Sequence, residues 1–193
     1  VTTVEDIPFG QAIPEPILTG LWEQHDRGAL TDDGLLLDLI EPTENEFELP
    51  EWRSFRGLTI ESWLKVTGST EILASDDYKL TYDAGIKAFS LQWGDVAAVS
   101  PALQETISDW HHVSVIVDAG PQTISWVLGG ELNQQSGWTR FPTELHTPNS
   151  NHSLRLAPSG SVELATVRIY GRAMRTAESL ISYRYYGQGM GIY

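Results

Sequence analysis

The sequence contains no cysteine, and this absence excludes disulfide bonds, thiol catalysis and cysteine-ligated zinc. It also has no apolar run of the roughly 18 residues that a membrane-spanning helix needs, so we expect no membrane insertion. Basic residues are few: 12 Lys and Arg stand against 26 Asp and Glu, which gives a formal net charge of −14. Because this charge repels phosphate and anionic lipid, nucleic acid is not an expected partner, whereas neutral sugars, divalent cations and cationic proteins are compatible with it.

Hydrophobic residues make up 41% of the 193 positions, and the chain has 7 Trp, 7 Tyr and 5 Phe. This content is sufficient for a buried core, and the length suits one large all-β domain, because sandwiches reach about 200 residues as a single unit. No internal repeat is visible. The sequence begins at Val1 with neither an initiator Met nor a signal peptide. We therefore expect a processed or excised part of a secreted, periplasmic or cell-surface protein.

The two ends of the chain differ from its middle. Residues 1–16 are rich in proline, which disfavours helix and central strand, so they predict an extended arm or linker. Residues 17–186 are the predicted domain. Residues 187–193 form a tail that alternates glycine with larger side chains, and such a tail needs a docking surface to become ordered. Before it, residues 176–181 predict a short helix, with Thr176 as the expected cap.

The middle of the chain predicts strands. Val113, Val115 and Val117 fall on one face of residues 109–118 and the intervening residues on the other, which is the period of a half-buried strand. Turns rich in Gly and Asp separate further strand-like segments at the spacing of a sandwich. These segments are residues 17–22, 35–40, 58–66, 72–74, 78–82, 86–93, 96–99, 123–128, 153–156 and 162–170. The acidic stretch 41–51 predicts a solvated loop, and residues 131–151 predict a long polar connection.

Three segments carry a family resemblance. They read Asp-Trp-His-His-Val-Ser-Val from Asp109, Phe-Arg-Gly-Leu-Thr-Ile-Glu-Ser-Trp-Leu from Phe55, and Ala-Thr-Val-Arg-Ile-Tyr-Gly-Arg-Ala-Met from Ala165. Together they resemble the concanavalin A-like lectin and glucanase superfamily, and within it the laminin-G and pentraxin-type domains. The resemblance implies an all-β, antiparallel two-sheet jelly-roll sandwich with a short C-terminal helix. This fold hosts lectins, adhesion modules, glycosidases and structural domains.

Catalytic residues are not predicted. The superfamily's glucanases carry a strand that reads Glu-x-Asp-x-x-Glu, which places acid and nucleophile on one face, and no such run exists here. The nearest acidic series lies within residues 44–51, where no apolar alternation would bury and tune a carboxylate. His111 and His112 are adjacent, so in a strand they point to opposite faces and cannot both bind one metal ion. We therefore assign them structural roles.

A sugar site combines an aromatic ring that stacks on a pyranose with amides or charged groups that bond its hydroxyls. Trp138 is the best candidate for the ring, because it lies in a polar stretch with Gln134, Gln135 and Arg140. Tyr78 is a second candidate. These five residues are the predicted ligand-binding set, and the remaining tryptophans are assigned to packing.

No obligatory cofactor is expected, and the one ion to consider is calcium. Turns of a jelly roll often supply converging carboxylate and carbonyl oxygens at the strand ends. Asp76, Asp77 and Asp118 occupy such turns and are the candidate ligands. The alternative is ordinary turn chemistry, in which an aspartate bonds to its own backbone two residues further on.

Three functions are open at this point. The first is a non-catalytic, extracytoplasmic module that binds carbohydrate or a glycoconjugate. The second is a protein-interaction or structural module, or an accessory subunit of a larger assembly, that docks onto another chain through its termini. The third is a glycosidase or polysaccharide lyase, and it ranks last because no catalytic constellation can be assembled from the strand spacing.

Overall fold

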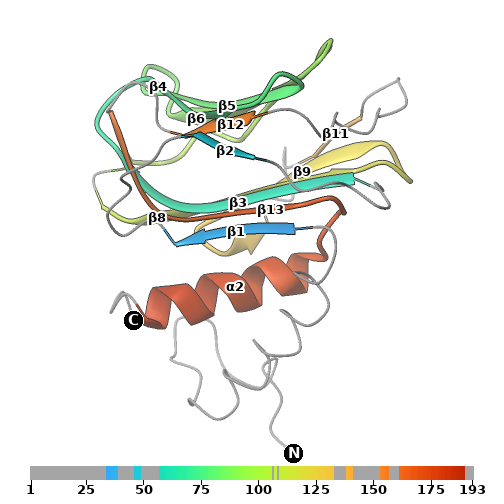
Figure 1. Cartoon of the computed structure of the whole chain (residues 1–193). Helices are drawn as coiled ribbons and strands as arrows, with labels where there is room; N and C mark the ends of the chain where they lie inside the picture. The colour runs from blue at the N-terminus through green and yellow to red at the C-terminus, as the bar shows by residue number, and fades with distance from the viewer. Residues whose placement is uncertain are drawn as a thin grey trace, which may run out of the picture.

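Two antiparallel sheets lie face to face, and one helix covers the far side of the first of them (Figure 1). This arrangement confirms the predicted fold class, a two-sheet sandwich with a short C-terminal helix. The predicted arm (1–16) and the first predicted strand (17–22) lie outside the residues described. The computed structural model describes residues 34–38, 46–48, 57–105, 107, 109–132, 138–140, 153–156 and 161–189.

Sheet A has seven strands among the described residues, and its central strands are the three segments that carry the family resemblance. Strand β3 pairs with β13 on one side and with β8 on the other, so segments far apart in the sequence are neighbours in space. The order is β1 (Gly34–Asp38), β13 (Val162–Tyr170), β3 (Gly57–Val66), β8 (His111–Asp118), β9 (Thr123–Leu128) and β10 (Glu131–Leu132), and β11 (Trp138–Arg140) also pairs with β9.

Sheet B has six strands, four of which follow one another in the sequence as a meander. Tight turns join these four, so each pairs with the next. The other two strands, β2 and β12, come from distant segments and complete the sheet beside β4. The order is β2 (Glu46–Glu48), β12 (Ser153–Leu156), β4 (Thr70–Ala74), β5 (Tyr78–Asp83), β6 (Ala88–Trp93) and β7 (Val96–Val99).

Strand β2 corrects one expectation. It lies inside the acidic stretch 41–51, which the sequence predicts to be a loop, yet its residues pair with β12. Phe47 explains the difference, because it lies between two glutamates and packs against the core while Glu46 is exposed. A single apolar residue between charges gives too short an alternation to be recognised as a strand. Strands β10 and β11 likewise lie within the predicted connection 131–151.

The core lies between the sheets, where the inward side chains of both are buried. Val113, Val115 and Val117 are at most 1% exposed, so they occupy the buried face that the alternation predicted. Phe89 of β6 stacks over Trp126 of β9 with ring centroids 6.5 Å apart, which joins the two sheets through aromatic contact. Burial of each large apolar side chain stabilises the fold by about 1.5–3 kcal/mol.

Helix α2 (Thr176–Gly189) lies along the outer face of sheet A (Figure 1). It is longer than the predicted helix and includes residues 187–189 of the predicted tail. Gly187 is buried, as are Ser179, Ser182 and Arg184, so contact with the sheet sustains the helix beyond residue 181. Among the described residues, no helix has both the length and the apolar character needed to cross a bilayer.

Glu178 caps the start of α2 instead of Thr176. Its carboxylate accepts a hydrogen bond of 2.6 Å from the backbone N–H of Arg175, the residue before the first helical position. This is one half of a capping box, in which an acidic side chain in the first turn satisfies a free backbone donor. The guanidinium of Arg172 donates two hydrogen bonds of 3.0 and 2.8 Å to the same carboxylate, so the turn before the helix is held firmly.

Because α2 covers sheet A, β8 is buried on both faces, and the expectation of a half-buried strand is wrong. The layer beneath the helix is polar. Glu61 of β3 accepts hydrogen bonds from His112 Nε2 at 2.7 Å and from Ser182 Oγ at 2.9 Å, and all three residues are at most 2% exposed. Tyr183 of α2 stacks on Trp63 with centroids 5.4 Å apart. The helix therefore closes the outer face of sheet A, whereas no helix among the described residues lies on that of sheet B.

Candidate functional site

The outer face of sheet B carries polar side chains from neighbouring strands. Along β5 and β6, Tyr78, Leu80, Leu91 and Trp93 point into the core, so the residues between them point outward. Strand register then brings one outward residue from each strand into a row across the sheet. That row reads Glu46, Arg155, Ala74, Lys79, Gln92 and Ala97.

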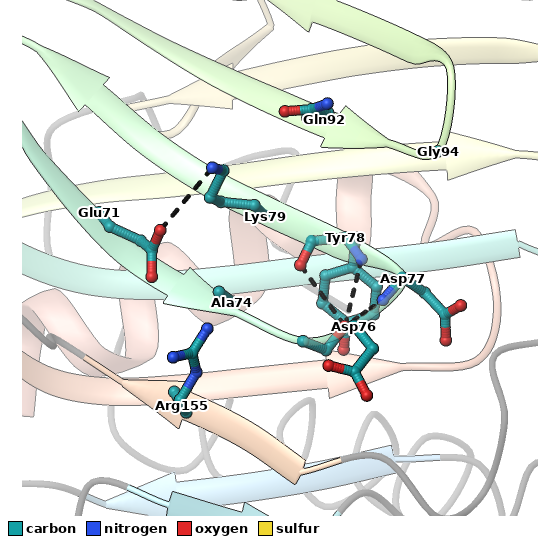
Figure 2. A pocket seen from close by; sticks show the side chains of 10 residues that line it. Glu71, Ala74, Asp76, Asp77, Tyr78, Lys79, Gln92, Gly94 and Arg155 are labelled. Carbon is teal, nitrogen blue, oxygen red and sulfur yellow. Dashed lines mark hydrogen bonds and ion pairs between the residues drawn. The ribbon is translucent and has the colours of Figure 1, made fainter.

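The four inner members of this row line a pocket of about 280 Å³, which we call the sheet B pocket (Figure 2). Strands β4, β5, β6 and β12 and the turn between β4 and β5 supply its walls. Charged and amide side chains dominate the lining, so the pocket is suited to a polar ligand. The lining residues are Glu71, Ala74, Ser75, Asp76, Asp77, Tyr78, Lys79, Gln92, Gly94 and Arg155.

The turn at the edge of the sheet B pocket is fixed by Ser75. Its hydroxyl oxygen accepts hydrogen bonds from the backbone N–H of Asp77 at 3.3 Å and of Tyr78 at 3.2 Å. The backbone N–H of Gly94 donates to the carbonyl of Asp77 at 3.2 Å, which ties the turn to the end of β6. A serine that bonds the backbone two and three residues ahead is a common way to stabilise such a turn. The carboxylates of Asp76 and Asp77 are therefore presented from a rigid segment.

Lys79 and Glu71 of the sheet B pocket are only loosely paired. Lys79 Nζ lies 3.9 Å from Glu71 Oε2, and these side chains are 44% and 27% exposed, so water screens their attraction. Figure 2 shows Arg155 beside Ala74 and draws no hydrogen bond or ion pair from Arg155 or Gln92 to the other lining residues. Both side chains are exposed. Their hydrogen-bonding groups are thus able to reach a ligand.

Tyr78 lines this pocket, but its ring is buried and not exposed as the sequence analysis expects. Its ring is 2% exposed and packs against Trp93, with centroids 5.7 Å apart. Burial raises the pKa of its hydroxyl above the ordinary range, because the charged form would lose its hydration. The expectation of an exposed ring that stacks on a sugar is therefore wrong for Tyr78, since alternation along β5 turns it toward the core.

The structure places the other predicted ligand-binding residues elsewhere. Trp138 and Arg140 belong to β11, which pairs with β9 in sheet A, so they are not in the sheet that carries the pocket. Arg140 is exposed. Gln134, Gln135 and the side chain of Trp138 lie outside the described residues, and the role proposed for them remains a prediction.

The three predicted calcium ligands are divided between the sheets. Asp76 and Asp77 line the sheet B pocket, whereas Asp118 ends β8 in sheet A. The Asp118 carboxylate accepts a hydrogen bond of 3.0 Å from the backbone N–H of Gly120, which is the alternative turn chemistry. Within the part of the chain that the structure describes, no three Asp, Glu or His side chains gather closely enough to hold a metal ion.

A second pocket, of about 340 Å³, lies between the 103–109 segment and the start of β8. Trp110, which the sequence assigns to packing, is only partly buried and forms part of its wall. Trp110 stands at the start of a strand and beside the charged Asp109. This position is the sequence signal that could have indicated a partly exposed ring. We call this site the Trp110 pocket, and its lining residues are Leu103, Gln104, Glu105, Ile107, Asp109, Trp110 and His111.

The buried group of Glu61, His112 and Ser182 contains the residue types of a hydrolase triad but cannot act as one. Ser182 donates its hydrogen bond to Glu61 and not to His112, so the imidazole is not placed to take the proton of the hydroxyl as it would in a triad. All three side chains are also enclosed beneath α2. The group is therefore a structural link between sheet A and the helix, in agreement with the structural role expected for His112.

His111 makes the stability of the protein sensitive to acid. Burial lowers its pKa from 6.5 to about 4, and repulsion from His112 adds to this effect. Between these values the unfolded chain binds a proton at His111 and the native protein does not, so stability falls by up to about 1.4 kcal/mol per pH unit as the pH drops from 6.5 to 4. His111→Gln should show a shallower decline in urea unfolding over this range. Slopes that are equal for the two proteins would contradict the assignment.

Comparison with known proteins shows the fold and not a family. No protein-family profile and no curated protein matches the chain. Among solved structures, the binding domain of botulinum neurotoxin DC in complex with SialylT is 10% identical with a TM-score of 0.52, over 67% of this chain and 35% of that one. The same domain in complex with rat synaptotagmin II is 8% identical, with the same TM-score and coverage.

A sialidase is similar over more of the chain. Trypanosoma rangeli sialidase in complex with sialic acid is 12% identical with a TM-score of 0.51, over 90% of this chain and 38% of that one. The chain thus spans little more than a third of the length of these proteins. At such identities the likeness shows the fold alone, which is a β-sandwich.

Proposed function

We propose that this chain is a non-catalytic, extracytoplasmic carbohydrate-binding module of the concanavalin A-like jelly-roll type, with its ligand site in the sheet B pocket. The observation that carries the proposal is the lining of that pocket, where hydrogen-bond donors and acceptors converge in about 280 Å³. Arg155 and Lys79 donate, Asp76 and Asp77 accept, and Gln92 does both. Sugar hydroxyls donate and accept as well, so a saccharide can pair with each of these groups.

The charge of the pocket favours a neutral saccharide. Glu71, Asp76 and Asp77 outnumber Lys79 and Arg155, so an anionic sugar would meet net repulsion in addition to that of the whole chain. Because the Tyr78 ring is buried, recognition here depends on hydrogen bonds and not on stacking. One saccharide unit would occupy the pocket, and neighbouring units would lie along the open face of sheet B.

The neighbouring structures support carbohydrate binding in general. One toxin binding domain was solved with SialylT and the sialidase with sialic acid, so proteins that share this sandwich bind glycans. The non-catalytic part of the proposal depends on the carboxylates. Asp76 is exposed, and Asp77 and Glu71 are only partly buried, whereas a catalytic acid needs an apolar enclosure that keeps it protonated.

Removal of the donors in the sheet B pocket should abolish binding while the fold is retained. Arg155→Ala is expected to weaken binding at least roughly tenfold, because a hydrogen bond from a charged donor contributes about 1.5–3 kcal/mol. Gln92→Ala should have a smaller effect. The measurement is a screen of neutral and acidic glycans, followed by affinity electrophoresis of each variant in gels that contain the polysaccharide bound by the wild type.

Glu163→Gln is the matched control, because Glu163 is exposed on β13 of the other sheet. It should bind like the wild type. If the Arg155→Ala, Gln92→Ala double variant melts normally and still binds, the sheet B pocket is not the site.

Calcium at Asp76 and Asp77 is a separate proposal. It is tested by thermal melting in millimolar calcium, since an ion that binds only the folded state raises the melting temperature.

A second candidate function is protein interaction. Ile86 and Val99 are 56% and 50% exposed, and Val99 belongs to β7, an edge strand of sheet B. An exposed apolar side chain on a strand edge favours contact with another chain. One toxin domain of this fold was solved with rat synaptotagmin II, which shows that the fold accommodates a protein partner. Loss of a purified complex in a Val99→Asp variant that still binds glycan would support this second role.

A further inference from the structure

Strand β7 is the last strand of sheet B, and the direction of its backbone groups follows from one hydrogen bond. The backbone N–H of Ser100 donates to the carbonyl of Phe89 at 2.8 Å, and these two residues lie opposite each other in the register of β6 and β7. Hydrogen-bonded and non-hydrogen-bonded pairs alternate along an antiparallel ladder. Ala98 therefore bonds to β6, whereas the N–H and C=O groups of Ala97 and Val99 point away from it.

These outward backbone groups form an open strand edge. Ala97 is exposed and Val99 is 50% exposed. In the part of the chain that the structure describes, neither residue makes a hydrogen bond with its outward groups. The sequence of β7, Val-Ala-Ala-Val, also contains neither the charge nor the proline that protects many edge strands from pairing. The edge is therefore able to accept another strand.

A second copy of β7 complements this edge. When two such strands run antiparallel with Ala98 opposite its counterpart, Ala97 of each copy lies opposite Val99 of the other. Every outward N–H and C=O group of both strands then has a partner. Other registers fit less well. A shift in one direction would oppose Ala97 to Pro101, which has no N–H, and a shift in the other direction would place the charged Asp95 opposite Val99.

The charge and the size of this contact indicate how strong it is. Each copy has a formal net charge of −14, so the two copies repel each other, and added salt should screen that repulsion. The paired residues are uncharged, and the two Asp95 carboxylates lie at opposite ends of the paired strands. A contact centred on a four-residue strand is smaller than a standard interface, which buries about 1,200–2,000 Å². The pair is therefore weak and forms at high protein concentration.

We propose that two copies of this protein pair through β7, so that their B sheets join into one continuous antiparallel sheet. The second copy is thus the partner for the second candidate function, and its binding does not depend on glycan. The two-fold axis is perpendicular to the joined sheet, so both sheet B pockets open on the same side. Strands β6 of the two copies lie three strand spacings apart, about 14 Å. A repeating glycan then contacts both pockets, a consequence that rests on the proposed saccharide site.

Sedimentation velocity over a range of protein concentrations tests the pair. We expect the wild type to form dimers as its concentration rises, and to form more of them when salt is added. Val99→Lys should weaken association at least roughly tenfold, because it places a charge in the paired edge. Ile86→Lys is the matched control. Ile86 is 56% exposed in the turn between β5 and β6, so its substitution makes the same change in charge away from the edge and should leave association unchanged.

Two results would overturn the proposal. One is a wild type that stays monomeric up to roughly 1 mM, and the other is a folded Val99→Lys variant that associates as strongly as Ile86→Lys. Binding of a short glycan to dilute Val99→Lys, with Arg155→Ala as the negative control, reports on the sheet B pocket alone. The pair and the saccharide site can therefore fail independently.

Cysteine cross-linking tests the register, because the chain has no cysteine of its own. Residues in a hydrogen-bonded antiparallel pair have Cα atoms about 5.5 Å apart, which a disulfide bond can span. An equal mixture of Ala97→Cys and Val99→Cys should therefore form a disulfide-linked dimer under diamide oxidation faster than either variant alone. Linking that is as fast for Ala97→Cys alone as for the mixture contradicts the proposed register.

Discussion

Gly57→Ala is expected to lower the free energy of unfolding by at least about 3 kcal/mol and the melting temperature by roughly 6–12 °C. Gly57 opens β3 and pairs with Asp118 of β8. A Cβ at this position would collide with the carbonyl oxygen of Val117 and would lie 2.9 Å from the backbone nitrogen of Ala173. Both neighbours are backbone atoms that cannot rotate away. The φ of +155° is also one that L residues rarely adopt, so strain adds to the collision.

Gly68→Ala is the matched control for this prediction. Gly68 lies in the turn between β3 and β4, and an added Cβ would meet no atom within 4 Å. Its substitution should change stability by less than about 0.5 kcal/mol. Thermal melting and urea unfolding followed by circular dichroism measure both variants. If Gly57→Ala unfolds at the same urea concentration as Gly68→Ala, the close approach of β3, β8 and the segment before α2 is wrong.

The sequence predicts the strands well because a core-facing strand has a strong local signal. Val113, Val115 and Val117 alternate with other residues, and they are buried between the sheets as expected. The same signal works for residues 78–82 and 123–128, which are found in β5 and β9. Each of these predictions needs only the period of two that a pleated strand imposes on its side chains. No information about distant segments is required.

The covered face of sheet A could not be predicted in this way. Glu61, Ser114 and Arg168 lie on that face, and such polar residues normally indicate exposure to water. Alternation separates the two faces of a strand but does not show whether a polar face meets solvent or a helix. The length of α2 depends on tertiary contact too, because Gly187 and Arg184 are buried in the folded protein. A helix that tertiary contact stabilises has a weak signal of its own.

The sheet B pocket was only partly predictable for a related reason. The sequence predicts Asp76 and Asp77 as calcium ligands, because an acidic pair in a turn is visible in it. Gln92 and Arg155 are single polar residues on separate strands, and only the order β12, β4, β5, β6 brings them to one pocket. Pairing between strands far apart in the chain is a property of the folded state. A single sequence carries no local pattern for it.

Glu61→Ala is expected to lower the free energy of unfolding by about 2–6 kcal/mol, since it leaves two buried donors without their hydrogen-bond acceptor and each such group costs about 1–3 kcal/mol. In the native protein the Glu61 carboxylate accepts hydrogen bonds from His112 Nε2 at 2.7 Å and from Ser182 Oγ at 2.9 Å. His112 is 0% exposed and cannot turn to water. The lost bonds also include the contact that fastens α2 to sheet A, so the helix should loosen in the same variant.

Hydrogen exchange of the α2 amides, measured beside urea unfolding, distinguishes loss of the helix contact from general destabilisation. Glu163→Ala is the control, because Glu163 is an exposed glutamate on a neighbouring strand of the same sheet, and it should cost less than about 0.5 kcal/mol. Ser182→Ala removes only one hydrogen bond to Glu61 and should cost about 1 kcal/mol. If Glu61→Ala is as stable as Glu163→Ala, the polar layer does not hold the helix.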